Sequence, residues 1–269
     1  MSLIQELFIE LKRQGKTGLI PFITAGDPSL EDTVLFMHAL VRGGADVIEL
    51  GIPFSDPMAD GPVIQRASER ALLNGTSLHS CLDMVREFRK SNSKTPVVLM
   101  GYANPIEQMG INEFARLASL AGVNGVLVVD YPPEECRELA TSLKLHGIDT
   151  IFLLAPTSSS ERILAVAKIA SGYIYYVSLN GVTGSSNINT SDVANAIDHI
   201  RKQTNIPIAV GFGISDAASA KIVGQSADAV VIGSRLVKII EDAPIGGSAK
   251  SLEEFLFVIR NALNADIPL

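Results

Sequence analysis

A glutamate inside an apolar run is the first residue whose position suits chemistry. Glu49 lies in DVIELG (46–51), a segment that otherwise has the composition of a buried strand. Burial raises the pKa of an unpaired carboxyl toward neutrality, where the group can both donate and accept a proton. A buried ion pair is the alternative, but the predicted strands contain no Lys or Arg that could serve as the partner. We therefore favour a functional role for Glu49.

Two more acids, Asp56 and Asp60, follow in the loop PFSDPMADGP (53–62). Prolines restrict the chain, so this loop can hold an acid in a fixed place. Asp60 has two interpretations, which the spacing does not separate. It can cap a helix that begins near Pro62, or it can face Glu49 across one cavity.

Three glycine-bearing turns follow late apolar runs and are candidates for binding phosphate. They are GVTG (181–184), GFGIS (211–215) and GS (233–234). A glycine before a helix lets backbone N–H groups approach an anion at the positive end of that helix. Glycine is also ordinary in such turns, so it is the three together that indicate a phosphate site. Arg235 follows the last turn, and its side chain could equally face solvent.

The other reactive residue types give fewer signals. Tyr173 and Tyr175 share one face of YIYYV (173–177), and one hydroxyl is a candidate to reach the cavity, although buried tyrosines more often satisfy a core hydrogen bond. The four histidines show no ligand spacing, so we expect no metal site. The absence of a Ser-His-Asp arrangement and of a Gly-x-Ser-x-Gly segment disfavours nucleophilic acyl transfer.

These residues belong to a regular series of predicted elements. Short apolar runs predict eight strands buried on both faces, at 19–24, 46–50, 96–100, 125–129, 150–154, 173–177, 207–211 and 228–232. Apolar residues three and four apart predict helices at 30–42, 112–121, 133–146, 159–170, 191–204 and 215–224. This alternation implies parallel strands joined by crossover helices.

Eight such repeats in 269 residues predict a (β/α)8 TIM barrel, whose active site lies at the carboxyl ends of the strands. The rival is an open doubly wound sheet, but no G-x-G-x-x-G follows the first run. We expect two additions: an N-terminal helix over 3–11 that plugs the barrel, and an extra helix within 51–95, after the second strand. No linker divides the sequence, so we expect residues 1–269 to form one domain.

Charge and cysteine content limit the partners. The chain has 22 basic and 29 acidic residues, a net charge of −7 and no basic block, which excludes nucleic acid and anionic membranes. The longest charge-free stretch, 169–191, is too rich in Ser, Asn, Thr and Gly to span a membrane. Cys81 and Cys136 lie too far apart for a disulfide framework, and acids interrupt the N-terminal MSLIQELFIELKRQ where a signal peptide is apolar. We expect a cytoplasmic protein.

Over essentially its whole length the chain resembles the tryptophan synthase alpha subunit family. The matching segments are PFITAGDP (21–28), ELGIPFSDPMADGPVIQ (49–65), MGYANP (100–105), GVLVVDYPPEE (125–135), GVTG (181–184), GFGIS (211–215) and GSRLVKII (233–240). The second is highly specific, whereas GFGIS or GS would match many phosphate-binding barrels. The resemblance implies the (β/α)8 fold and the reversible retro-aldol cleavage of indole-3-glycerol phosphate to indole and glyceraldehyde 3-phosphate.

The resemblance also implies residue roles. Glu49 would protonate indole C3 and deprotonate the C3′ hydroxyl, Asp60 would stay ionised to stabilise positive charge on the indole nitrogen, and Tyr175 would lie near the cavity. The indole would lie between Phe22, Met100, Leu127 and Phe212. The phosphate would be bound by Gly184, Gly213, Gly233 and Ser234.

A partner is implied as well: a beta subunit that contains pyridoxal phosphate and joins indole to serine within an αββα complex, so that this chain itself needs no cofactor. The surface facing that subunit would include Asp56, Pro57, Asn104 and Pro132. Loops 53–60 and 179–193 would close over the substrate. Position 100 is Met where Leu is familiar, and Leu179 replaces a residue that is basic in some members, which puts one lid contact in doubt.

Two alternatives remain open at this point. A stand-alone indole-releasing lyase would share the architecture and need no partner. A noncatalytic subunit that only activates its partner would belong to another class, and the presence of both Glu49 and Asp60 argues against it.

Overall fold

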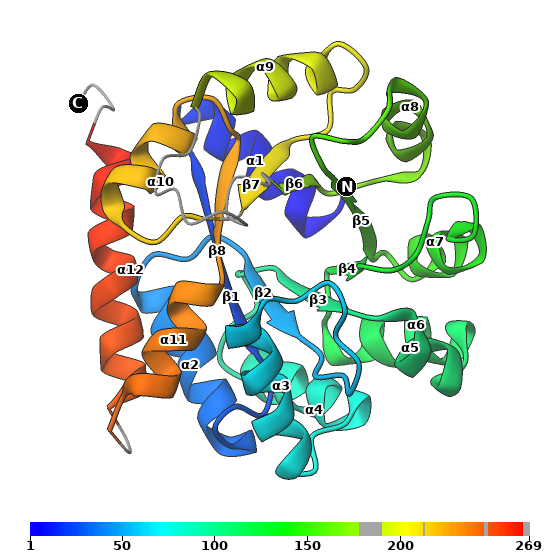
Figure 1. The fold of residues 1–269 in the computed structure, drawn as a ribbon. Coiled ribbons are helices and arrows are strands. Elements are labelled where there is room, and N and C mark those ends of the chain that lie inside the picture. Colours follow the sequence, from blue (N-terminus) through cyan, green and yellow to red (C-terminus); the bar gives the residue numbers. More distant parts are fainter. Residues whose placement is uncertain (178–189, 212, 245–246, 266–269) are drawn as a thin grey trace.

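Eight parallel strands close into a barrel in the computed structural model, which describes residues 1–177, 190–211, 213–244 and 247–265, without the side chains of residues 190–191 (Figure 1). The strands follow sequence order around the barrel, and β8 pairs with β1. Their bounds are β1 (Gly18–Thr24), β2 (Ile48–Gly51), β3 (Val97–Gly101), β4 (Gly125–Val128), β5 (Asp149–Leu154), β6 (Ile174–Val177), β7 (Ile208–Gly211) and β8 (Ala229–Ile232). The closed barrel confirms the predicted fold and rules out the open sheet.

Helices surround this barrel (Figure 1). Their bounds are α1 (Leu3–Arg13), α2 (Leu30–Arg42), α3 (Pro62–Leu73), α4 (Leu78–Arg89), α5 (Ala103–Met109), α6 (Ile111–Ala121), α7 (Arg137–Leu145), α8 (Ser160–Ile169), α9 (Thr190–Arg201), α10 (Ala217–Gly224), α11 (Ser234–Asp242) and α12 (Ser248–Asn264). The additions at the N-terminus and after β2 are confirmed as α1 and α3. The predicted helix at 133–146 was too long, because the N–H groups of Glu135 and Cys136 both donate to the carbonyl of Pro132 in a turn before α7 begins.

Side chains alternate between the inside and the outside of the barrel, as the period of two along a strand requires. On β2, Ile48 and Leu50 pack outward in the large cluster under the helices, so Glu49 between them faces inward. The interior cluster includes Ile4 and Phe8 of α1. The N-terminal helix therefore packs into the barrel interior, as predicted. Among the described residues, no helix is both long and apolar enough to cross a membrane.

Candidate active site

Glu49 is a fully buried acid inside the barrel. Its Oε1 accepts a hydrogen bond of 2.5 Å from the hydroxyl of Tyr173, while Oε2 has no hydrogen-bond partner among the described residues. Burial raises the pKa of Glu49 to about 7, and the Tyr173 hydrogen bond opposes that rise. No Lys or Arg forms an ion pair with Glu49 in the described part of the chain, so the ion-pair alternative is wrong.

Tyr173 and Tyr175 both lie on the inner side of the strand region around β6, and Tyr176 packs in the outer cluster, as the alternation predicts. The structure places the hydroxyl of Tyr173 on Glu49, although the family resemblance draws attention to Tyr175. Burial, and then the charges of Glu49 and Asp60, raise the pKa of Tyr175 well above its usual value. The hydroxyl of Tyr175 therefore lies within electrostatic range of both carboxylates.

Gly211 on β7 makes room for that tyrosine. A Cβ atom at Gly211 would lie 2.1 Å from the Tyr175 hydroxyl oxygen, a distance that real Cβ atoms do not tolerate. The two residues are near neighbours across the β6–β7 ladder, where Tyr175 pairs with Ala209 and Val177 with Gly211. Gly211 thus serves packing inside the barrel in addition to any role in the turn that follows.

Asp60 does not cap the helix that follows it. Gly61 is the N-cap of α3 and makes no side-chain capping bond, so the capping alternative is wrong. Instead Asp60 Oδ2 accepts a 3.0 Å hydrogen bond from the hydroxyl of Tyr102, which in turn accepts one from the N–H of Ala59. Phe54 stacks on the Tyr102 ring at 5.1 Å. Burial raises the pKa of Asp60, and the Tyr102 hydrogen bond opposes the rise.

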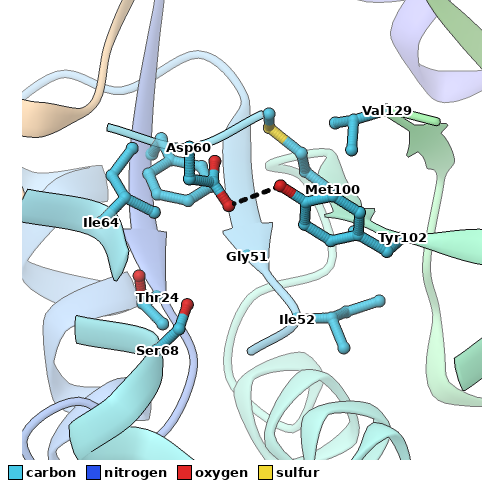
Figure 2. A pocket seen from close by; sticks show the side chains of 11 residues that line it. Thr24, Gly51, Ile52, Asp60, Ile64, Ser68, Met100, Tyr102 and Val129 are labelled. Atoms are coloured by element: carbon cyan, nitrogen blue, oxygen red, sulfur yellow. Dashed lines mark hydrogen bonds between the residues drawn. The ribbon is translucent and has the colours of Figure 1, made fainter. Parts of the chain in front are cut away.

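Asp60 opens onto a small cavity that Figure 2 shows from close by. Its volume is about 10 Å³, roughly the room for one water molecule. The lining residues are Phe22, Thr24, Gly51, Ile52, Asp60, Ile64, Ser68, Met100, Gly101, Tyr102 and Val129. Two of these residues, Phe22 and Met100, are ones that the resemblance assigns to the indole pocket. Leu127 instead lies fully buried in the barrel interior, beside Met100 in the β3–β4 register.

Glu49 is not among the residues that line this cavity. It is paired in register with Phe22, which does line it, across the β1–β2 ladder. The two carboxylates have separate partners, Tyr173 for Glu49 and Tyr102 for Asp60. Thr24, another cavity residue, has a buried hydroxyl that finds no hydrogen-bond partner within the described ranges.

The predicted phosphate region is described in part. Gly233 is the N-cap of α11 and makes no side-chain capping bond, and Ser234 is the first residue of that helix. Gly213 has a φ of 74°, which favours glycine. The guanidinium of Arg235 lies 5.8 Å from the ring centre of Phe255 on α12. Gly184, Phe212 and Leu179 lie outside the described residues.

The four residues predicted to face a partner lie in segments that follow β2, β3 and β4. Asp56 and Asn104 are exposed, while Pro57 and Pro132 are half-buried. Met58, in the same loop as Asp56, leaves 79% of its surface exposed. The N–H of Ala103 donates to Asp130 Oδ1 at 2.8 Å, so the segments that carry Asn104 and Pro132 are held together.

Metal and disulfide chemistry find no support in the described ranges. Those residues contain no group of three His, Cys, Asp or Glu side chains that could hold a metal ion. Cys81 and Cys136 are buried and unpaired. Sequence reasoning missed Tyr102 and Tyr173 as partners of the two acids. The motif MGYANP contains Tyr102, but nothing in that pattern tells which acid a tyrosine contacts.

A closed parallel barrel that holds a buried acid in its interior, with a second acid on the segment after β2, defines this molecule as a (β/α)8-barrel protein with a site suited to proton transfer. Residues 8–264 match the family model described as "Tryptophan synthase alpha chain". The chain belongs to the tryptophan synthase alpha chain family.

Relatives and solved structures agree with this assignment. The chain is 68% identical to the tryptophan synthase alpha chain of Polynucleobacter asymbioticus and 64% identical to that of Cupriavidus pinatubonensis, covering 98% of this chain and 100% of each relative. The crystal structure of tryptophan synthase subunit alpha from Legionella pneumophila matches with a TM-score of 0.93 at 43% identity, over 98% of this chain and 99% of that one.

A complex offers a further comparison. A chain of the tryptophan synthase complex from Pyrococcus furiosus matches with a TM-score of 0.82 at 37% identity, over 91% of this chain and 98% of that one.

Proposed function

We propose that this chain is the alpha subunit of a tryptophan synthase, a lyase that cleaves indole-3-glycerol phosphate to indole and glyceraldehyde 3-phosphate for tryptophan synthesis. Family membership supports the activity. One observation of the site carries it: a fully buried carboxyl, Glu49, whose pKa is raised to about 7. A group with that pKa exchanges protons readily near neutral pH.

Glu49 is the proposed general acid and base. Its proton passes to indole C3, so that the indole can act as the leaving group while positive charge develops on the ring nitrogen. The C3–C3′ bond then breaks as the C3′ hydroxyl becomes the aldehyde of glyceraldehyde 3-phosphate. The proton of that hydroxyl returns to Glu49, so the acid is regenerated and the atoms balance. The unpartnered Oε2 supports this role, because it leaves one oxygen free for the substrate.

Asp60 is the proposed partner of the indole nitrogen. An ionised carboxylate there stabilises the positive charge of the protonated ring more in the transition state than in the bound substrate. Burial alone would favour the neutral form of Asp60, and the hydrogen bond from Tyr102 supports ionisation. We propose Tyr175, within range of both acids, as a third polar group of the site.

Substrate binding is proposed at the two ends of this site. The indole ring would lie among Phe22, Met100, Leu127 and Phe212. Because the cavity has room for about one water, the lining side chains must move apart to admit the ring. The phosphate would bind Gly184, Gly213, Gly233 and Ser234. The uncapped start of α11 supports that placement, since free N–H groups there favour an anion.

We propose a beta subunit as the partner, in an αββα complex. Solved relatives include the P. furiosus tryptophan synthase complex and M. tuberculosis tryptophan synthase in an aminoacrylate-bound form. The exposed Asp56 and Asn104 and the half-buried Pro57 and Pro132, on segments that follow β2, β3 and β4, support a contact there. We assign pyridoxal phosphate to that partner, as the family resemblance implies. We further propose a cytoplasmic location.

Indole release from indole-3-glycerol phosphate, with and without a beta subunit, tests this proposal. We expect slow release by the chain alone, a higher rate with the beta subunit, and co-elution of the two chains. No indole under either condition would contradict the lyase. Equal rates with and without the beta subunit, without co-elution, would favour a stand-alone lyase. A noncatalytic activator would be favoured if indole formed only in the presence of the partner and the Glu49→Gln chain were as effective as the wild type.

A further inference from the structure

Helix α3 lies beside the cavity, and its fully buried side chains are small. It begins two residues after Asp60 and contributes Ile64 and Ser68 to the cavity wall. Its buried side chains are the small residues Ala67, Ser68 and Ala71. Ala67 packs with Phe22 and Val237 in a small cluster that is separate from the large core. Val63 and Ile64 of α3 are partly buried against the same cluster. Because the fully buried side chains are small and bury little apolar area, polar contacts add to the packing that fixes this helix.

Those contacts are ionic and centre on Arg70. Its Nε and Nη2 donate to both carboxylate oxygens of Asp27 at 2.7 and 2.9 Å, and its Nη1 donates to Glu241 at 2.9 Å. Glu241 also accepts two hydrogen bonds from Arg66 and one from Lys238. Asp27 is only 1% exposed, and the Arg70 guanidinium pairs with this buried side chain through two donors.

The network joins three parts of the site. Asp27 lies in the loop after β1, the strand that carries Phe22. Arg70 lies on α3, and Glu241 lies on α11, the helix whose first residue is Ser234. Figure 1 shows α3 and α11 side by side, and the packing of Ala67 on Val237 agrees. One side chain therefore bridges the loop beside the indole pocket and the helix proposed to bind phosphate.

We propose that Arg70 is a positioning residue that sets the separation between the indole pocket and the phosphate end of the site, an inference that rests on the proposed function. It acts through α3 and α11 and touches no substrate. A guanidinium suits this task because its planar fork binds Asp27 with two donors while a third donor reaches Glu241. A lysine keeps the charge but offers no such fork.

Arg70→Lys tests this proposal against a matched control. Arg260→Lys changes a similarly bridging arginine, which binds Asp46 at 2.5 Å and the carbonyls of Thr17 and Gly44 at the amino-terminal end of the barrel. Both variants are expected to lower the melting temperature. We expect Arg70→Lys alone to lower kcat/KM for indole-3-glycerol phosphate by about tenfold, since small misplacements of binding groups have effects of this order.

Binding of glycerol 3-phosphate, measured by calorimetry, adds a readout that does not need turnover. We expect several-fold weaker binding in Arg70→Lys and wild-type binding in Arg260→Lys. Equal losses of kcat/KM in the two variants, or unchanged kinetics and binding in Arg70→Lys, would overturn the positioning role. If the wild type binds glycerol 3-phosphate but releases no indole, the proposed function fails while the binding comparison still decides the role of Arg70. If the wild type does not bind glycerol 3-phosphate, the positioning role is overturned too.

Discussion

The hydroxyl of Tyr173 donates a 2.5 Å hydrogen bond to Glu49 Oε1 in the interior of the barrel. Two opposing effects meet in this pair. Burial removes water from the carboxylate and raises the pKa of Glu49, while the tyrosine stabilises the ionised form and lowers it. Their balance leaves a pKa of about 7. The tyrosine therefore tunes the acid that the proposed reaction uses.

Removing that hydroxyl is expected to change the pH profile. In Tyr173→Phe the pKa of Glu49 should rise further, because burial then acts without opposition. If neutral Glu49 is the form that protonates indole C3, the alkaline limb of kcat moves to higher pH. Rates between pH 6 and 10 measure the shift, with Tyr176→Phe, on the outer side of β6, as control. A limb that stays in place would contradict the tuning role.

Stability should also depend on the charge of Glu49. The pKa of Glu49 rises from an ordinary 4.5 to about 7 on folding, so the folded protein holds this proton more tightly than the unfolded chain does. The contribution of Glu49 to the free energy of unfolding is fully present below about pH 4.5 and is lost as the pH rises through about 7. The free energy of unfolding of Glu49→Gln minus that of the wild type should therefore increase by about 2 to 3 kcal/mol when the pH is raised from 5 to 8.

Urea unfolding at both pH values measures that difference, with the exposed Glu138→Gln as control. A Gln variant whose stability relative to wild type is the same at pH 5 and pH 8 would show that Glu49 keeps an ordinary pKa in the folded protein.

Tyr102 should support the ionised form of Asp60. Without its hydroxyl, the pKa of Asp60 should rise, since burial already raises it and the hydrogen bond opposes that effect. In Tyr102→Phe a smaller fraction of Asp60 is ionised at low pH, so the acid limb of kcat/KM moves to higher pH. The profile from pH 5 to 8 measures this limb. An unchanged limb would mean that the charge of Asp60 does not govern the rate.

Gly233→Ala tests the phosphate site without disturbing the fold. A Cβ at Gly233 would lie 3.4 Å from Phe22, an ordinary contact, and the φ of −118° suits alanine. Gly213→Val would instead force a β-branched residue to a φ of 74°. In Gly233→Ala we expect the KM for indole-3-glycerol phosphate to be about tenfold higher than in the wild type, because the added methyl group blocks the approach of the phosphate to the N-terminus of α11.

The matched control is Gly61→Ala, at the N-cap of α3, where a Cβ meets open space. Its KM should stay at the wild-type value. A normal KM in Gly233→Ala would place the phosphate elsewhere.

Periodicity in the sequence predicted the barrel well, because the strands are mostly apolar runs bounded by turn residues. All eight strands begin within two residues of the predicted positions. The helices after β8 were not predicted, although α11 begins at Ser234 within a recognised motif. The start of α7 was misplaced because a proline is as compatible with a turn as with a first helical turn.

Side-chain contacts were harder to predict, since they join residues far apart in the chain. Glu49 stood out because a carboxylate within a strand is costly to bury. The choice of Tyr173 over Tyr175 as its partner depends on small differences in depth within the barrel, and both tyrosines share the same face. Arg70 resembled any charged residue on a helix surface, since its partners Asp27 and Glu241 lie 43 and 171 positions away.

Indole release from saturating indole-3-glycerol phosphate by wild type and by Glu49→Gln, with the beta subunit present, tests the central claim most directly. The amide keeps the shape of the side chain but has no transferable acid proton. We therefore expect substrate binding to persist while kcat falls by more than about a thousandfold, in the range of general acid–base catalysis. A Glu49→Gln kcat within about tenfold of wild type, about 1.4 kcal/mol in the barrier, would contradict the assignment of Glu49 as the acid and base.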